Sequence, residues 1–112
     1  MISSLENIQA HNQALEARFF NKLKINYQLN RQLVSFQANK NKPFYRWFKY
    51  KEGFSEALVQ YLLDHLNFDT GRILDPFAGT GTTLFVASER GLDATGIELL
   101  PVGCEIMEVR KL

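Results

Sequence analysis

The stretch "ILDPFAGTGTTLFVASERG", residues 73–91, decides the fold of this 112-residue chain. An apolar pair leads into Asp75, a turn with two glycines follows at Gly79 and Gly81, and an apolar stretch then ends at Gly91. This order predicts a short strand, a glycine turn and a helix that Gly91 closes at its C-terminal end. A strand, a glycine turn and a helix in succession are typical of sites that bind a nucleotide-type cofactor.

The flanking sequence extends this unit to the order helix, strand, helix, strand, helix. Ser55 is expected to cap the first helix, which runs to about His65 and buries Leu58, Val59, Leu62 and Leu63. The remaining elements are predicted at "RILD" (72–75), Thr82 to Arg90, "DATGIEL" (93–99) and from Pro101 onward. We therefore expect an α/β fold, the start of a doubly wound, Rossmann-like parallel sheet. Two parallel strands are too few for such a sheet, whose edges must be extended or covered.

Residues 1–39 are interpreted as an N-terminal helical arm, and residues 40–112 as a partial cofactor-binding domain. A helix is predicted from residue 4 to about 24, with Ser4 as its N-cap and one apolar face formed by Leu5, Ile8, Leu15, Phe19 and Leu23. Residues 25–38 are ambiguous, because "QLVSFQA" alternates as a short strand would but also fits a continuation of the arm. The arm is a candidate to cover a sheet edge or to dock on a partner subunit.

Composition limits the class of protein. The length allows one domain at most, and 46% hydrophobic residues can support a core. A formal net charge of +1 gives no argument for nucleic-acid binding from total charge. The single cysteine, Cys104, cannot form an internal disulfide, and no apolar run approaches the roughly 20 residues of a membrane span. We expect a cytoplasmic chain with neither a signal peptide nor a membrane segment.

The residues around the glycine turn discriminate between classes of cofactor. A phosphate-binding P-loop requires a lysine after its second glycine, and none is present. A dinucleotide site requires a third glycine where this chain has Leu84. Asp75 would repel a pyrophosphate at the end of its strand, but its carboxylate suits a ligand with a sulfonium and an ammonium group. S-adenosylmethionine is such a ligand.

A second acid supports the same cofactor. Glu98 ends "ATGIE" 23 residues after Asp75, near the offset at which an acid binds ribose hydroxyls. An ionised carboxylate accepts both hydroxyls, and each such hydrogen bond contributes roughly 1.5–3 kcal/mol. The alternative is that Gly79 and Gly81 only form a tight turn and that Glu98 is solvated. The combination of Asp75, the glycines, the following hydroxyls and Glu98 favours the cofactor site.

The motif "LDPFAGTGTT" resembles the cofactor motif of the amino-methyltransferases, which methylate the exocyclic amine of adenine or cytosine in DNA. That family has the pattern D-P-F-x-G-x-G-T, which this chain matches at Asp75, Pro76, Phe77, Gly79, Gly81 and Thr82. "GIE" resembles the second motif of the family, and this resemblance implies that Glu98 binds the ribose. The resemblance covers about residues 43–105 and implies a Rossmann-like, S-adenosylmethionine-dependent methyltransferase fold.

The segment "RWFKYKEGFSEALVQYLL" resembles the family segment that precedes the glycine turn and holds the methionine end of the cofactor. The candidates to line that end are Tyr50, Phe54 and Ser55. Ser55 begins a helix whose free N–H groups favour an anion, and the methionine carboxylate is the anion available. The alternative for all three residues is ordinary packing at the start of a helix.

The catalytic motif of the family, Asp/Asn/Ser-Pro-Pro-Tyr/Phe/Trp, is not found in this sequence. The three prolines stand at 43, 76 and 101, and no two are adjacent. No residue is therefore assigned a catalytic role, and no segment resembles a target-recognition domain. The resemblance implies the cofactor-binding part of a site-specific DNA methyltransferase of a restriction-modification or similar system. A second methyltransferase polypeptide would then carry the Pro-Pro-aromatic motif and most of the contacts with DNA.

Other interpretations remain open. The chain also fits a truncated or decayed copy, a fragment of an RNA methyltransferase, or a non-catalytic remnant that binds the cofactor or a partner subunit. A basic run holds Lys40, Lys42, Arg46, Lys49 and Lys51, interleaved with aromatic residues. Such a run suits direct DNA contact, but we favour aromatics in the core with the lysines as a solvated rim. His11 and His65 lack partners at metal-binding spacing, so no metal site is predicted.

Overall fold

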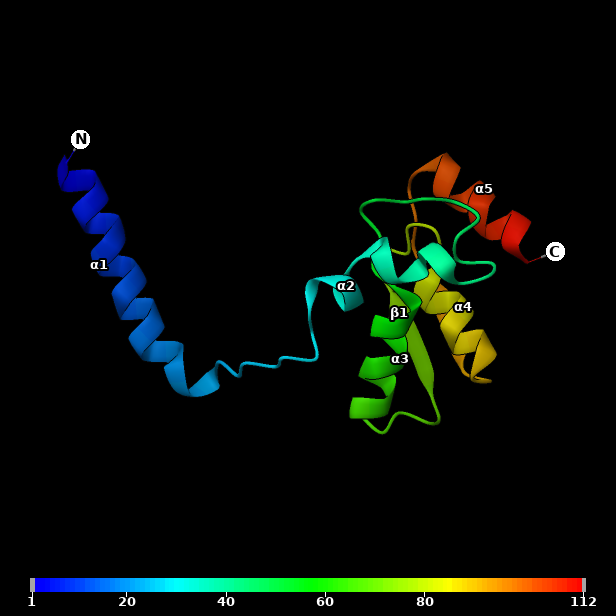
Figure 1. The fold of residues 1–112 in the computed structure, drawn as a ribbon, viewed down its shortest axis with the longest axis horizontal. Coiled ribbons are helices and arrows are strands. Elements are labelled where there is room, and N and C mark those ends of the chain that lie inside the picture. Colours follow the sequence, from blue (N-terminus) through cyan, green and yellow to red (C-terminus); the bar gives the residue numbers. More distant parts are fainter. Residues whose placement is uncertain (1, 112) are drawn as a thin grey trace.

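In the computed structural model, which describes residues 2–111, a helical arm leads into a small α/β unit (Figure 1). The arm consists of α1 (Ile2–Phe19) and the 3-10 turn η1 (Phe20–Lys22). The α/β unit contains, in order, α2 (Arg31–Val34), η2 (Phe36–Asn41), α3 (Glu56–His65), β1 (Arg72–Asp75), α4 (Thr82–Glu89), β2 (Asp93–Gly96) and α5 (Pro101–Arg110). The order predicted from residue 55 onward is confirmed.

The two strands pair in parallel, with Ile73 opposite Ala94 and Asp75 opposite Gly96. Ile73 and Ala94 point to the face that packs against the core, whereas Leu74, on the opposite face, is 64% exposed. The helices α3 and α4 contact each other and pack on this one face of the strand pair (Figure 1). The prediction of an α/β unit with a parallel pair of strands is therefore confirmed. One face of that pair carries no covering element within the described residues.

The core forms where α3 and α4 meet. Its buried apolar residues are Tyr45, Val59, Leu63, Val86, Ala87 and Leu92. The predicted burial of Val59 and Leu63 is confirmed, but Leu58 is only half-buried and Leu62 is 42% exposed. The aromatic residues interleaved with the basic run are divided between core and surface. The ring of Tyr45 is in the core, whereas Trp47 is 66% exposed. Burial and the nearby Glu89 raise the pKa of the Tyr45 hydroxyl, which donates to Glu89 Oε1 at 3.1 Å.

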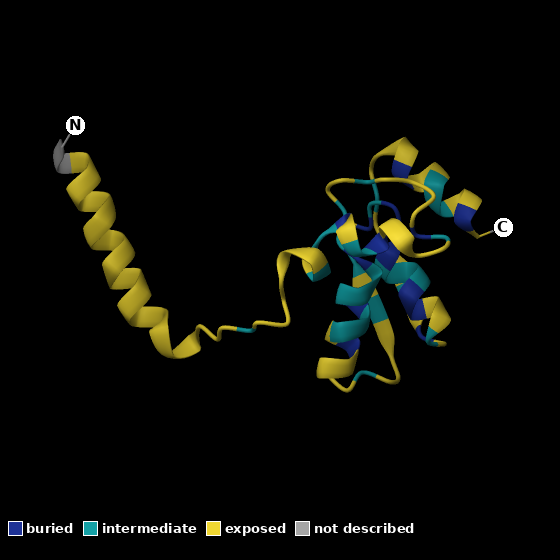
Figure 2. Cartoon of the chain, viewed as in Figure 1, coloured by how far each residue is buried: buried dark blue, intermediate teal, exposed yellow. Residues whose placement is uncertain are grey.

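The arm is helical as predicted, with a correction to the start of its helix. Its helix starts at Ile2, so Ser4 lies inside the first turns and does not cap them. The predicted apolar face is exposed along its length (Figure 2), with Leu5, Ile8, Leu15, Phe19 and Leu23 between 37% and 68% exposed. No helix within residues 2–111 combines the length and the apolar character that crossing a membrane requires.

Of the two alternatives for residues 25–38, the strand was wrong and the helical one is confirmed only in part, because the segment forms the separate helical turns α2 and η2 and does not continue α1. Asn30 accepts from Leu33 N at 2.9 Å and thereby starts the separate short helix α2. Ser35 ends that helix and starts η2 by accepting from Gln37 N at 3.4 Å. Polar side chains that bond to nearby backbone N–H groups compete with both a strand ladder and a continuous helix.

Residues before position 40 already contact α3. Asn26 Nδ2 donates to the hydroxyl of Tyr61 at 2.7 Å. Asn39, which is 2% exposed, accepts from Glu56 N at 2.9 Å and donates to Phe54 O at 3.4 Å. These contacts fix the first turn of α3. The domain boundary between residues 39 and 40 stays a prediction.

Candidate functional site

The glycine turn starts where β1 ends. Asp75 Oδ1 accepts from Phe77 N at 3.0 Å, which reverses the chain directly after the strand. Gly79 and Gly81 both have positive φ angles, 54° and 83°, and Gly81 immediately precedes α4. Thr82 is the first residue of α4, as predicted, and is buried.

The other carboxylate oxygen of Asp75, Oδ2, is buried and has no hydrogen-bond partner within the described residues. A buried acceptor without a partner is costly, since it has lost its water and gained nothing in return. In parallel α/β sheets, ligands bind at the carboxyl ends of the strands, which is where Asp75 stands. The oxygen is therefore a candidate to accept from a cationic or hydrogen-bonding ligand.

Glu98 lies at the same edge of the sheet. Backbone hydrogen bonds connect the two ends, because Ile97 N donates to Asp75 O and Ala78 N donates to Ile97 O, both at 2.9 Å. Glu98 Oε2 accepts from Gly79 N at 2.8 Å, and its Oε1 accepts from Leu100 N at 2.6 Å. The structure thus brings Asp75, Gly79 and Glu98 together.

These hydrogen bonds affect the chemistry of Glu98. The N–H of Leu100, followed by that of Gly79, stabilises the charged carboxylate and lowers the pKa of Glu98 below its ordinary value. A carboxylate offers about four lone-pair sites, so two acceptor sites remain for a ligand. Glu98 is therefore ionised at neutral pH, holds the glycine turn, and keeps the capacity to accept from two hydroxyl groups.

The sequence-predicted aromatic residues occupy different places. A Cβ atom added to Gly79 would lie 3.4 Å from Cε1 of Tyr50, so the ring of Tyr50 lies beside the glycine turn. Phe54 packs instead against the core and lines a cleft of about 220 Å³ together with Ile73 and Thr83. Of the two, only Tyr50 is placed next to the turn by these contacts.

The hydroxyl of Ser55 is committed to the fold. Ser55 is fully buried, and its Oγ accepts from Leu58 N at 3.0 Å, which confirms its predicted role as the cap of α3. The same hydroxyl donates to Leu33 O in α2. Pro76 and Phe77 of the D-P-F motif are exposed, and Phe77 is 86% exposed.

The N-terminal part of α5 lies directly against the glycine turn. A Cβ atom added to Gly103 would lie 2.6 Å from Gly79 O and 2.8 Å from Cγ of Glu98. Cys104 Sγ donates to Glu98 O at 3.6 Å. A glycine at position 103 therefore allows the close approach, a role that the sequence does not reveal because helical glycines have many causes.

Arg110, at the other end of α5, is also part of this arrangement. Its Nη1 donates to Thr80 O in the glycine turn at 2.9 Å, and its Nη2 donates to Tyr45 O at 3.3 Å. The guanidinium carbon lies 5.5 Å and 5.9 Å from the ring centroids of Phe44 and Phe85. Arg110 is only 7% exposed. Basic residues are common in the last turn of a helix, so the sequence carried no signal for this burial.

A cavity of about 560 Å³ lies beside the site, between α4, β2 and α5. Its lining includes Glu98, Gly96, Leu84 and Met107. Its size is within the range of about 300–1,000 Å³ typical of small-molecule sites. The cavity reaches the site from the β2 side.

Comparison with known proteins bears on this geometry. The sequence profile of the DNA methylase family matches residues 5–109. The chain belongs to the DNA methylase family. It is 54% identical over 111 residues to the Type II methyltransferase M.AvaI of Nostoc sp. and to that of Anabaena variabilis, covering 98% of this chain and 23% of each relative. It is 43% identical over 89 residues to the Type II methyltransferase M.BsoBI of Geobacillus stearothermophilus, covering 79% of this chain and 18% of the relative.

The matches cover most of this chain but only part of each relative. The chain spans less than a quarter of the length of these curated relatives. The match to the DNA methylase family starts in α1 and ends in α5, so it extends on both sides of the motifs at residues 43–105. The resemblance to DNA amino-methyltransferases is therefore confirmed at the level of the family. No solved structure matches the chain.

Proposed function

We propose that this chain supplies the S-adenosylmethionine-binding part of a site-specific DNA methyltransferase that acts on the exocyclic amine of adenine or cytosine. The observation that carries the proposal is the buried, unpartnered Oδ2 of Asp75 at the carboxyl end of β1, a strand end that backbone hydrogen bonds join to the segment that carries Glu98. Family membership, and the Type II methyltransferases among the relatives, support the same reaction. A Rossmann-like fold for the complete domain is part of this proposal.

The residues at the turn fit the cofactor chemically. Asp75 provides a negative charge where a cofactor with a sulfonium and an ammonium group requires one. Glu98 retains two acceptor sites, which suits the two hydroxyls of a ribose. Tyr50, beside Gly79, lines the same edge and is assigned to the methionine end. The bound cofactor supplies the methyl group, and these residues bind and orient it without transferring protons.

Phe54 and Ser55 have a supporting part in this proposal. Ser55 caps α3 and joins it to α2, and Phe54 packs between α3 and the sheet, so both hold the segment that carries Tyr50. Pro76, Phe77 and Gly81 lie in the turn between β1 and α4, Thr82 begins α4, and together they set the path of the chain around the cofactor.

The catalytic motif and target recognition are proposed to reside on a complementary polypeptide. The sequence contains no Pro-Pro-aromatic motif that would aim an amine at the methyl group. The outward face of the sheet, where Leu74 is 64% exposed, offers a surface on which such a polypeptide completes the domain. In a restriction-modification setting, the complete enzyme would mark a specific DNA site.

The test uses a chimaera in which this chain replaces the matched segment of the Nostoc M.AvaI (the Nostoc chimaera). Calorimetry should show binding of S-adenosylmethionine, and labelled cofactor should methylate DNA but not RNA. Asp75→Asn should weaken cofactor binding by about tenfold or more, because it removes a charged acceptor. The matched control is Asp69→Asn, since Asp69 is exposed in the loop before β1.

Three outcomes would contradict the proposal. Equal cofactor affinity of Asp75→Asn and the unsubstituted Nostoc chimaera would remove Asp75 from the site. Preferential binding of a dinucleotide would contradict the cofactor. Cofactor binding without any methyl transfer would contradict the enzymatic role and favour a non-catalytic remnant.

A further inference from the structure

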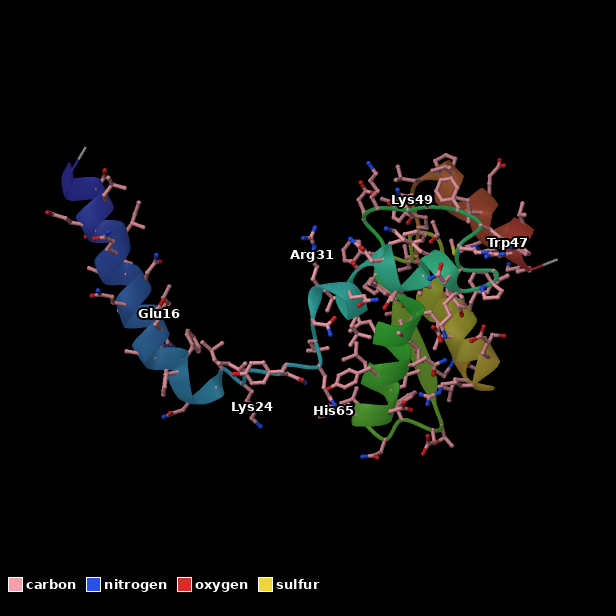
Figure 3. All side chains as sticks on the ribbon, viewed as in Figure 1. Glu16, Lys24, Arg31, Trp47, Lys49 and His65 are labelled. Carbon is pink, nitrogen blue, oxygen red and sulfur yellow. The ribbon has the colours of Figure 1, made fainter. Side chains whose placement is uncertain are left out.

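Another pocket, of about 340 Å³, lies between the α2–η2 segment and the loop that leads to α3. Its lining contains four cationic side chains, Arg31, Lys40, Lys49 and Lys51, together with Ser35, Phe36 and Gln37. We call this the basic pocket. Arg31 and Lys49 come from different segments of the chain, the short helix α2 and the loop before α3 (Figure 3). No carboxylate is among its lining residues.

The fold does not neutralise these charges. All four cationic side chains are exposed, and the ion pairs found within residues 2–111 involve other residues. Lys42, from the same basic run, shows the contrast, because its Nζ lies 3.4 Å from Glu56 Oε2. Four like charges around one pocket repel each other and attract an anion. Lys42 is thus paired within the fold, whereas the four cations of the basic pocket remain available to a ligand.

The neutral residues of the basic pocket suit the same kind of ligand. Ser35 Oγ accepts from Gln37 N, so its hydroxyl hydrogen remains available for donation. Hydroxyl, amide, ammonium and guanidinium donors are the groups that proteins use to contact nucleic-acid phosphates. The pocket is too polar and too strongly positive to suit an apolar partner.

Its position is equally informative. Lys49 and Lys51 flank Tyr50 in the sequence, and the ring of Tyr50 lies beside Gly79 of the glycine turn. Two of the lysines that would bind an anion in the basic pocket are therefore sequence neighbours of a residue at the proposed cofactor site. For a chain of the DNA methylase family, the polyanion that must approach this site is DNA.

We propose that the basic pocket binds phosphates of the DNA backbone, so that this chain contacts DNA directly beside its cofactor site. This inference rests on the proposed function, but it departs from the expectation that the lysines form only a solvated rim. Phosphate contacts fix the position of a protein on the duplex and carry no sequence information. The pocket therefore orients the DNA, while the base is selected elsewhere.

The test measures binding of a labelled DNA duplex to the Nostoc chimaera by fluorescence anisotropy over a range of salt concentrations. The variants Arg31→Gln and Lys40→Gln should each weaken binding about fivefold. Each should also lower the slope of log affinity against log salt by about 1. The effect should be equal for duplexes with and without the recognition site. A second pair, Lys49→Gln and Lys51→Gln, should behave in the same way.

Two controls make the outcome specific. Lys111→Gln removes the same charge from a lysine that pairs with Glu108 on α5, and it should leave DNA affinity unchanged. Calorimetry should give the same S-adenosylmethionine affinity for Arg31→Gln and Lys40→Gln as for the unsubstituted Nostoc chimaera.

The possible failures are distinguishable. Two results, obtained while the cofactor still binds, would overturn the DNA-binding role of the basic pocket and leave the proposed function standing. In the first, the pocket variants and Lys111→Gln weaken DNA binding equally. In the second, none of these variants weakens it. If the variants weaken binding of an RNA duplex but not of DNA, the inference is also overturned. If the unsubstituted Nostoc chimaera binds no cofactor while its DNA binding depends on the pocket, the proposed function fails and the pocket remains.

Discussion

The backbone N–H of Gly79 donates to Oε2 of Glu98 at 2.8 Å and so joins the glycine turn after β1 to the segment that follows β2. The other oxygen of Glu98 accepts from Leu100 N at 2.6 Å, at the start of α5. One carboxylate therefore connects the turn, the second strand and the last helix. Its ionisation state controls all of these connections together.

We predict that this connection weakens at acid pH. The N–H groups of Leu100 and Gly79 lower the pKa of Glu98 in the folded chain from its ordinary value of 4.5. The unfolded chain therefore binds a proton more readily, so the stabilisation is present above about pH 4.5 and is lost as the pH falls through the lower folded pKa. Thermal unfolding of the Nostoc chimaera between pH 7 and pH 3 measures this loss. Glu98→Gln cannot ionise at this position, so it should lack this pH-dependent part of the loss in stability.

The matched control is Glu105→Gln on α5, because Glu105 is exposed. It should retain the pH dependence of the unsubstituted Nostoc chimaera. An identical pH dependence in Glu98→Gln would show that the two hydrogen bonds do not contribute to stability.

We predict that two glycine substitutions with the same backbone cost differ strongly in stability. Gly81 and Gly91 both have positive φ angles, 83° and 70°. A Cβ atom at Gly81 would lie 2.7 Å from Met107 Cγ and 2.9 Å from Phe85 Cε2, whereas a Cβ atom at Gly91 would point into open space. Gly91→Ala should cost about 1–2 kcal/mol from the left-handed backbone alone. Gly81→Ala should cost a further 1–3 kcal/mol, roughly, from overpacking. Chemical denaturation of both variants checks the difference, and equal costs would contradict the close packing of α5 on the turn.

We predict that Arg110 positions the glycine turn. Arg110→Met keeps an apolar stem against Phe44 and Phe85 but leaves the carbonyls of Thr80 and Tyr45 without their donor. The expected loss is about 2 kcal/mol of unfolding free energy, together with weaker cofactor binding. Arg110→Lys should recover only part of this loss, because an ammonium lacks the planar fork that reaches two acceptors.

The control for Arg110 is Arg46→Met, since Arg46 is exposed. It should change the unfolding free energy by less than about 0.5 kcal/mol. Denaturation and calorimetry on the same samples separate stability from cofactor affinity. Full stability of Arg110→Met would contradict the prediction.

We predict that the two faces of β1 respond in opposite ways to a polar substitution. In the isolated 112-residue chain, Leu74→Thr should reduce self-association, because Leu74 is 64% exposed on the uncovered face. Ile73→Thr should instead destabilise the chain, because Ile73 packs against the core. Light scattering and thermal unfolding of the two variants provide the measurement. The unsubstituted isolated chain should be oligomeric or partly molten, and a monomer with a sharp transition would contradict this picture.

Local signals explain why most of the fold from residue 55 onward was predicted. Ser55 caps α3, Gly91 follows α4 with a positive φ angle, and Pro101 opens α5, and each acts within a few residues of its own position. In residues 25–41 the local caps Asn30 and Ser35 start two short helices. The position of these helices also depends on distant partners, such as Leu33 with Ser55 and Asn39 with Glu56, which periodicity does not reveal.

The candidate site was predictable to a similar extent. Parallel pairing of two strands brings Asp75 and Glu98 to one edge, and this follows from the strand order alone. The sequence did not indicate that Glu98 binds the N–H of Gly79, because this hydrogen bond depends on the path of the turn. Arg110 was missed for a related reason, since its burial arises from the packing of α5 on the aromatic run.

The exposed helix α1 has a consequence for assembly. Its 18 residues span about 27 Å at about 1.5 Å per residue, and residues 20–30 join it to α2. A surface bound by the apolar side of α1 is thereby tethered to the glycine turn. Short tethers of this kind give effective local concentrations in the millimolar range, roughly, so a weak contact elsewhere on the same partner becomes a stable one. If the proposed complementary polypeptide binds the apolar side of α1, its further docking on the α/β unit becomes an intramolecular step.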